Sequence, residues 1–97
     1  MTTSDPSDRQ RLDLWLVNAR FFKTRSMAAK FVEGGRVRLA RAGQESRLDK
    51  PARPVRVGDH LVFALGGRLI AVQVEAMGER RGPASEARAL YSTLEPS

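Results

Sequence analysis

Residues 11–39, RLDLWLVNARFFKTRSMAAKFVEGGRVRL, hold the strongest structural pattern in this chain. In the first part of this stretch, apolar residues recur at i, i+3, i+4 and i+7, at Leu12, Trp15, Leu16 and Ala19. This spacing is typical of one buried face of an α-helix. We therefore predict a first helix over residues 9–19, with the carboxylate of Asp8 as its N-cap.

A second helix is predicted after the turn FFKTRS at residues 21–26. Thr24 is a suitable N-cap, because its hydroxyl can accept a hydrogen bond from the first helical turn. The buried face of this helix is expected to hold Met27, Ala28, Phe31 and Val32. Gly34 and Gly35 are expected to end it. Helices this short, joined by so few residues, must pack at an angle, and the turn between them points outward.

The stretch ends in the alternation of a β-strand that starts at Arg36. Val37 and Leu39 are expected on the buried face, with Arg36 and Arg38 on the solvent face beside the inter-helix turn. The following residues, 40–54, have no apolar periodicity and contain glycine and proline, so they are predicted to form an exposed loop.

The second half of the chain has further strand signals. Val55 and Val57 indicate a short extended piece. Residues 60–65 and 68–75 flank Gly66–Gly67, a two-residue turn that predicts a β-hairpin.

A short C-terminal helix is predicted to begin near Pro83. Its apolar residues again have the spacing of one helix face, at Ala87, Leu90, Tyr91 and Leu94. These elements predict an α+β fold class. We divide the chain into a disordered tail (1–8), a folded domain (9–76) and a C-terminal extension with this short helix (77–97).

The charge is distributed unevenly along the chain. The net charge is +6, from 17 basic and 11 acidic residues. Residues 9–56 hold thirteen basic and four acidic residues (+9), and the remainder holds four basic and seven acidic residues (−3). Only three of the basic residues are lysine. Because arginine pairs with phosphate in a bidentate manner and stacks on bases, this bias favours a nucleic-acid partner over a merely solubilising surface.

The residue pattern gives no sign of a catalytic or metal site. Asp13 has no second carboxylate, histidine or nucleophile near it in sequence, so we expect it to pair with an arginine. His60 is the only histidine and the chain has no cysteine, a poor basis for a metal site. No GK[ST] motif follows Gly34–Gly35, so these glycines end a helix and do not cradle a nucleotide. We expect no enzyme activity, no metal and no cofactor.

No run of about 18 apolar residues is present, so no membrane-spanning segment is expected. The N-terminus is polar and unlike a secretory signal. The absence of cysteine excludes disulfides and suits a reducing cytoplasm.

Four motifs closely resemble the S4-type RNA-binding domain family: RLD at residues 11–13, FKTRS at 22–26, GGRV at 34–37 and VRVGDHL at 55–61. The resemblance covers about residues 9–75. It implies the S4-like (alpha-L) RNA-binding fold, in which two packed N-terminal helices lie on a small, curved, mainly antiparallel sheet. In that family the helix pair and the adjoining strand hold structured RNA.

The tail ERRGPASEARALY, residues 79–91, is similar to the C-terminal extension of the ribosome-associated heat-shock protein family of bacteria. This resemblance implies a cytoplasmic factor that binds ribosomal RNA or tRNA on free large ribosomal subunits. Members of that family bind subunits that still carry peptidyl-tRNA after translation has failed, and are thought to help recycle them. We expect the same function under heat stress, as a monomer and without a membrane partner.

Three positions depart from the family pattern. Leu14 replaces the usual lysine after RLD, and Val17 replaces a frequent aromatic residue. The family's Asn-Gly turn after the first strand reads ARAG at residues 40–43, and the loop that follows is longer. RNA contacts assigned to that turn would fall to Arg41 or Arg47 instead.

The predicted RNA-contacting residues surround the inter-helix turn and the strand that follows: Arg11, Arg20, Phe22, Lys23, Thr24, Arg25, Ser26, Lys30, Arg36, Arg38 and Arg41. Five of them, together with the first N–H groups of the second helix, form the expected clamp on RNA phosphates: Arg20, Lys23, Arg25, Arg36 and Arg38. Thr24 and Ser26 are expected mainly to cap the helix, and a capping hydroxyl at this turn can also contact RNA.

The aromatic residues of the turn offer a stacking surface for unpaired bases. Adjacent positions at a helix end point apart, so one of Phe21 and Phe22 should be buried and the other partly exposed. We favour Phe22 as the exposed one. Trp15 lies on the apolar face and is expected in the core.

Two alternative functions stay open. The chain could be the RNA-targeting partner subunit of a separate RNA-modifying enzyme, such as a pseudouridine synthase, because S4-type domains are often fused to such enzymes. It could also bind DNA, since two short helices joined by a turn superficially resemble helix-turn-helix proteins. The second alternative is weaker, because the basic residues gather at the turn and strand and not along the second helix.

Overall fold

The computed structural model describes residues 9–94 as two packed helices, a small third helix and two antiparallel sheets. The elements follow one another as β1 (Arg9–Arg11), α1 (Leu12–Asn18), α2 (Arg25–Glu33), β2 (Val37–Arg41), β3 (Gln44–Leu48), β4 (Pro54–Arg56), β5 (His60–Leu65), β6 (Arg68–Val74), α3 (Ala84–Arg88) and β7 (Tyr91–Thr93). The large sheet has the strand order β3-β2-β5-β6-β7, and β1 pairs only with β4. The predicted α+β class with an antiparallel sheet is confirmed. Within residues 9–94, no helix is long and apolar enough to cross a membrane.

The hydrophobic core lies between the helices and one face of the large sheet. Trp15 of α1 is completely buried, as predicted, and its indole N–H donates to the carbonyl of Ala76 at 3.0 Å. The large sheet contributes buried side chains at alternate strand positions: Val37, Leu39, Leu48, Leu61, Phe63, Val72 and Val74. The alternation predicted from Arg36 onward is confirmed, because it follows from the two-residue period of a strand.

The second helix begins and ends as the sequence predicts. The backbone N–H of Met27 donates to the hydroxyl of Thr24 at 3.1 Å, so Thr24 is the N-cap. Gly34 follows the last residue of α2, and Gly35 has a φ of +72°, a conformation that favours glycine. The expected burial of Met27 is wrong, because 52% of this residue is exposed. The helix turns Met27 to solvent while Ala28 and Val32 pack inward.

The first helix is shorter than predicted. Residues 9–11 form strand β1, and α1 starts at Leu12. The cause is a tertiary contact: the N–H groups of Leu12 and Asp13 donate to carbonyls of the loop before β4, at Arg53 and Pro51. The predicted cap, Asp8, lies outside the described residues.

The predicted loop at residues 40–54 is wrong in its first part, where β2 and β3 form a hairpin. Ala42 and Gly43 both have positive φ, +52° and +81°, as a tight two-residue hairpin turn requires. Strand β3 has no apolar alternation because it is an edge strand whose first four residues are exposed, and only Leu48 is buried. Strand β3 is stabilised mainly by backbone hydrogen bonds to β2 and not by burial of its side chains.

The β5–β6 hairpin is confirmed around Gly66 and Gly67. The C-terminal helix is only partly confirmed, because α3 ends at Arg88 and Tyr91 begins strand β7. The prediction that Tyr91 and Leu94 belong to the helix is wrong. The edge of β6 takes up this stretch instead, through the β6–β7 pairing and through hydrogen bonds such as that from the Leu94 N–H to the Ala71 carbonyl. The domain division at residue 76 stays a prediction, and β7 shows that part of the extension joins the same sheet.

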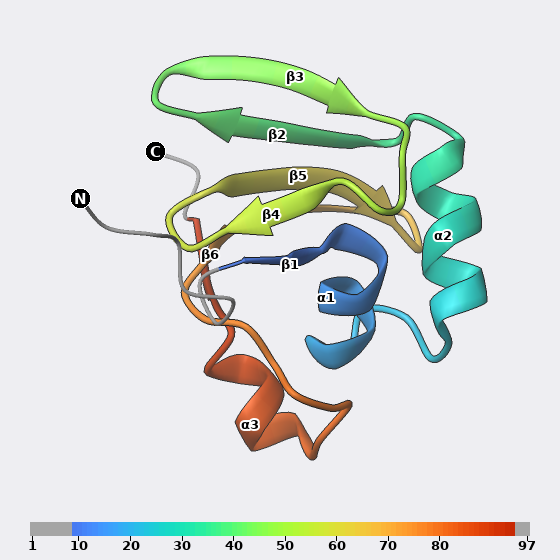
Figure 1. Cartoon of the computed structure of the whole chain (residues 1–97), viewed down its shortest axis with the longest axis vertical. Helices are drawn as coiled ribbons and strands as arrows, with labels where there is room; N and C mark the ends of the chain where they lie inside the picture. Colours follow the sequence, from blue (N-terminus) through green and yellow to red (C-terminus); the bar gives the residue numbers. More distant parts are fainter. Residues whose placement is uncertain (1–8, 95–97) are drawn as a thin grey trace.

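Between β6 and α3, the chain packs closely against α1, as Figure 1 shows for the orange stretch beside the blue helix. The carbonyl of Gly78 accepts hydrogen bonds from the side-chain amides of Gln10, at 2.7 Å, and Asn18, at 2.9 Å. A Cβ on Gly78 would lie only 2.9 Å from the side chains of Asn18 and Leu90. A glycine is therefore required here by close approach.

We predict that Gly78→Ala lowers the free energy of unfolding by about 1–3 kcal/mol, the usual cost of overpacking a tight site. The measurement is urea denaturation followed by circular dichroism. Gly82→Ala is the matched control from the same stretch. The three atoms nearest to its Cβ would all belong to the exposed carboxylate of Glu86, the closest at 2.7 Å, and this flexible side chain can move aside. Equal losses in both variants would contradict the close-packing explanation.

Candidate nucleic-acid interface

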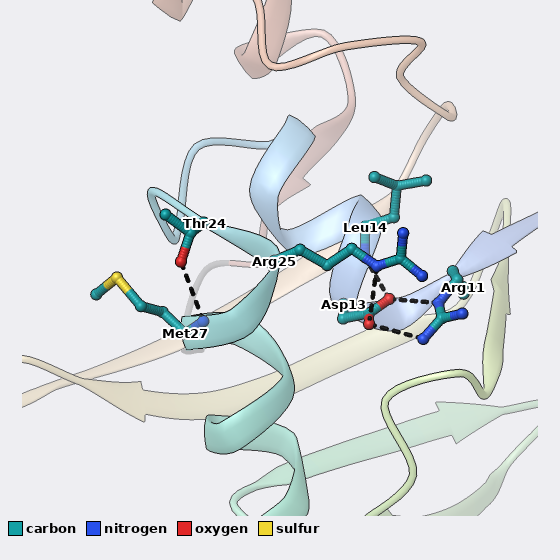
Figure 2. A network of polar contacts seen from close by, with 6 residues as sticks. All are labelled: Arg11, Asp13, Leu14, Thr24, Arg25 and Met27. Atoms are coloured by element: carbon teal, nitrogen blue, oxygen red, sulfur yellow. Dashed lines mark hydrogen bonds and ion pairs between the residues drawn. The ribbon is translucent and has the colours of Figure 1, made fainter.

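A buried carboxylate joins the starts of the two helices (Figure 2). The side chain of Asp13, in the first turn of α1, accepts from Nε of Arg11 at 2.7 Å and from Nη2 of Arg11 at 2.9 Å. It also accepts from Nε of Arg25 at 3.3 Å and from the backbone N–H of Leu14 at 2.7 Å. The predicted ion pair of Asp13 with an arginine is confirmed, and it involves two arginines. They come from the end of β1 and the first residue of α2.

These contacts keep Asp13 charged. Burial raises the pKa of its carboxyl, but the hydrogen bonds from Arg11, Leu14 and Arg25 outweigh burial and lower the pKa below its ordinary value. The hydrogen bonding between Arg11 and Asp13 also raises the pKa of Arg11. The two arginine side chains remain 40% and 52% exposed, whereas the Asp13 side chain is 2% exposed. Each guanidinium has five N–H donors and uses only one or two on Asp13, so further donors are free for an anion.

A second group of guanidiniums lies where α2 ends and the β2–β3 hairpin begins. The guanidinium carbon of Arg36 is 5.5 Å from the ring centroid of Phe31, within the range of a cation–π contact. Arg38 and Arg47 are directly opposite one another in the β2–β3 register, so their side chains share the exposed face of the hairpin. The side chain of Arg47 also packs on Gly35, with Cδ and Nε 3.5 Å from where a Cβ would be.

The local electrostatics leave these charges largely available. Arg38 has an acidic partner, Glu45, at 3.7 Å, but both side chains are about two-thirds exposed. An exposed pair at this distance contributes little and is easily exchanged for another anion. Lys30 is exposed in the last turn of α2, and Lys23 and Ser26 are exposed at its start. The described residues thus hold one group of cations at each end of α2, which is about 13 Å long at 1.5 Å per residue.

Two predicted contact residues are engaged elsewhere. Arg20 has a positive φ of +68°, and its Nη1 donates to the carbonyl of Gly82 at 2.8 Å, toward the C-terminal part of the chain. Arg41 donates through Nε and Nη2 to both carboxylate oxygens of buried Asp59, at 2.8 and 2.7 Å. The hydrogen bond to Asp59 raises the pKa of Arg41. Neither arginine joins the groups at the two ends of α2, and their RNA contacts stay predictions.

The expectation for the two phenylalanines is wrong in its assignment. Phe22 is buried, at 8% exposure, with its ring centroid 5.1 Å from that of Phe31. Phe21 is the partly exposed one, packed edge-on against Phe63. The reason is tertiary: α2 covers Phe22, and the side chain of Arg81 donates to its carbonyl at 3.3 Å. Phe22 therefore has no open ring face on which a base could stack.

The sequence pattern does not predict Arg81 as a neighbour of the inter-helix turn. It lies 59 positions away from Phe22, in a stretch that the sequence assigns to a separate extension. The one signal that could have pointed to it is the run GERRG after Met77, a local basic pair in an otherwise acidic half of the chain.

We predict that Asp13→Asn lowers the free energy of unfolding at neutral pH by about 2 kcal/mol, because it weakens charge-assisted hydrogen bonds to a buried group. A lowered folded-state pKa stabilises the fold above the unfolded-state value, about 3.9. This stabilisation is lost as the pH falls through the folded-state pKa, so the difference between parent and variant should shrink in acid. Urea denaturation across a pH series measures it, with exposed Asp49→Asn as control. A difference that grows in acid would contradict the assignment.

Similarity to known proteins covers most of this chain. The S4 domain family matches residues 10–61. Heat shock protein 15 of Escherichia coli (strain K12) is 43% identical over 86 residues, which cover 89% of this chain and 61% of that protein. The chain therefore spans about three-fifths of the length of this relative. The RQC P-site tRNA stabilizing factor of Listeria innocua is 29% identical over 84 residues, covering 87% of this chain and 85% of that protein.

A solved structure gives the same result for the fold. The trimeric structure of Vibrio cholerae heat shock protein 15 superposes with a TM-score of 0.76 at 37% identity, over 90% of this chain and 83% of that one. Both resemblances inferred from the sequence are confirmed. The chain belongs to the S4 domain family, and within it to the group of heat shock protein 15.

Proposed function

We propose that this protein is a non-enzymatic RNA-binding factor that acts on the large ribosomal subunit. The observation that carries the proposal is the pair of arginine groups at the two ends of α2: Arg11 and Arg25 on Asp13, and Arg36, Arg38 and Arg47 at the glycine turn. Membership of the S4 domain family supports RNA as the ligand.

The arrangement suits the phosphate backbone of folded RNA. Planar guanidiniums match phosphate oxygens with two parallel N–H donors, which lysine cannot do. Asp13 holds Arg11 and Arg25 in place, and the Phe31 ring supports Arg36, so less side-chain freedom is lost when RNA binds. A rigid spacing of about one short helix between the two groups favours structured RNA over a flexible single strand.

The finer function rests on the named relatives. One is called a heat shock protein, and another is called a P-site tRNA stabilizing factor. We propose by analogy that this protein binds free large subunits that carry peptidyl-tRNA and supports their recycling when translation stalls under heat stress. The expected site of action is the bacterial cytoplasm.

The alternatives have different consequences. A targeting subunit of an RNA-modifying enzyme would be recovered in a stable complex with that enzyme, whereas a stand-alone factor would not. DNA binding receives no support from the relatives. The expectation of a monomer stays a prediction. The related V. cholerae structure is described as trimeric, so a trimer is the alternative to be tested. Sedimentation velocity of the purified protein distinguishes a monomer from a trimer.

We predict that the double variant Arg36→Gln, Arg38→Gln weakens binding to isolated bacterial large subunits. It should also make the slope of log K against log salt shallower by about one for each phosphate that the variant no longer neutralises. The measurement is fluorescence anisotropy of labelled protein across a salt series. Arg56→Gln is the control, because Arg56 is an exposed arginine at the end of β4 away from α2 (Figure 1). An unchanged slope in the double variant would count against this surface.

We also predict that the protein in a heat-shocked bacterial lysate sediments with free large subunits and not with intact ribosomes. Nuclease treatment of the lysate should release it, since the proposed contacts are made to RNA. Sedimentation in a complex with an RNA-modifying enzyme, with no subunit present, would favour the alternative function.

A further inference from the structure

Residues 76–83 lie between β6 and α3 and are hereafter called the C-terminal segment. This segment lies against the turn between α1 and α2. Two arginines connect them in opposite directions. Arg20 of the turn donates to the carbonyl of Gly82 at 2.8 Å, and Arg81 of the segment donates to the carbonyl of Phe22 at 3.3 Å. Phe22 is peptide-bonded to Lys23, so the guanidinium of Arg81 lies at the backbone that carries this exposed lysine.

The C-terminal segment is positioned by three partly buried hydrogen bonds. The Trp15 indole donates to the Ala76 carbonyl, and the Gln10 and Asn18 amides converge on the Gly78 carbonyl. The contacts come from β1 and α1, the same elements that hold Asp13. These hydrogen bonds fix the position of the backbone that leads to Arg81.

Both connecting arginines keep most of their donors. Each guanidinium has five N–H groups, and the hydrogen bond across the turn uses one of them. Arg20 and Arg81 are exposed, and among residues 9–94 neither has an acidic partner within 4 Å. The neighbouring Arg80 differs, because its Nη2 is 2.9 Å from the Glu86 carboxylate.

The surface continues from Arg20 toward α3. A small hollow of about 140 Å³ lies beside Arg20, and Arg88 of α3 lines its other side. The aromatic residues Phe21 and Tyr91 also line it, and their ring centroids are 5.0 Å apart. Cations next to an apolar hollow suit a ligand that combines phosphates with flat, stackable groups, which is the chemistry of an RNA strand.

We propose that Arg20 and Arg81 form a second phosphate-binding surface, at which RNA held along α2 continues over the inter-helix turn onto the C-terminal segment. The inference rests on the proposed function and extends its surface from Arg20 to Arg81, which lies outside the matched S4 region. Each arginine already donates to a backbone carbonyl, Arg20 to that of Gly82 and Arg81 to that of Phe22. RNA binding therefore costs little additional side-chain entropy. Arg81 donates to the backbone of the turn, whereas the adjacent Arg80 pairs with Glu86 and lines a different hollow, beside Arg9 and Gln10.

The test compares Arg81→Gln with Arg80→Gln, two adjacent changes that remove the same charge. Binding to isolated bacterial large subunits is measured by anisotropy across a salt series, and thermal unfolding checks each variant. Arg81→Gln should make the salt slope shallower by about one, and Arg80→Gln should leave it unchanged. Arg81→Lys should restore the slope, because it keeps the charge, whereas a purely structural role of Arg81 would not be rescued in this way.

A second measurement needs no variant. Phenylglyoxal modifies accessible arginines, and mass spectrometry reads the extent at each position in the free and the subunit-bound parent protein. Arg81 should be protected on binding while Arg80 stays reactive. Equal modification of Arg81 in both states, or an equal decrease of the slope in the two glutamine variants, overturns the inference while the proposed function stands. If the parent protein does not bind large subunits at all, the proposed function fails and the second surface fails with it.

Discussion

The buried charge of Asp13 is the constraint that organises the helix pair. A carboxylate that is taken out of water must be compensated by hydrogen bonds and opposite charge. Asp13 obtains them from Arg11, Arg25 and the backbone of Leu14 (Figure 2). Hydrogen bonds of this kind are directional, so the requirement of a core residue fixes where two surface guanidiniums lie. The start of α2 therefore has an organised cationic edge in the absence of any ligand.

Asp59 is a second buried carboxylate that is paired with an arginine, but its arginine connects two parts of the sheet. This carboxylate is also buried, and Arg41 satisfies both of its oxygens while the Arg56 N–H donates to one of them. Here the arginine is used to join the end of β2 to the turn before β5. Among residues 9–94, Arg11, Arg25 and Arg41 thus bind buried carboxylates, whereas other arginines, such as Arg36 and Arg47, are exposed and have no acidic partner within 4 Å. Net charge alone cannot separate these uses, because both raise it equally.

The C-terminal segment is joined to the helix pair by hydrogen bonds. Its carbonyls accept from Trp15, Asn18 and Arg20, which are residues of α1 and of the turn after it. Strand β7 then pairs with β6 and forms one edge of the large sheet. A substitution that displaces this segment should also displace the inter-helix turn, because hydrogen bonds connect the two. Residues far apart in the sequence can therefore contribute to one RNA-binding surface.

Local sequence is enough to specify the two helices, the Thr24 cap, the glycine stop, the Gly66–Gly67 hairpin and the pairing of Asp13 with an arginine. These features depend on local spacing, on backbone conformation or on a buried charge, and each is encoded within a few residues. The remaining features arise from contacts between distant parts of the chain. Strand β3 has no apolar pattern because pairing with β2 creates it, and Tyr91 joins a strand because β6 offers an open edge. Phe22 is buried because α2 folds back over it, and Arg81 meets the inter-helix turn because a segment distant in sequence lies there. Neither contact can be predicted from the local spacing of residues.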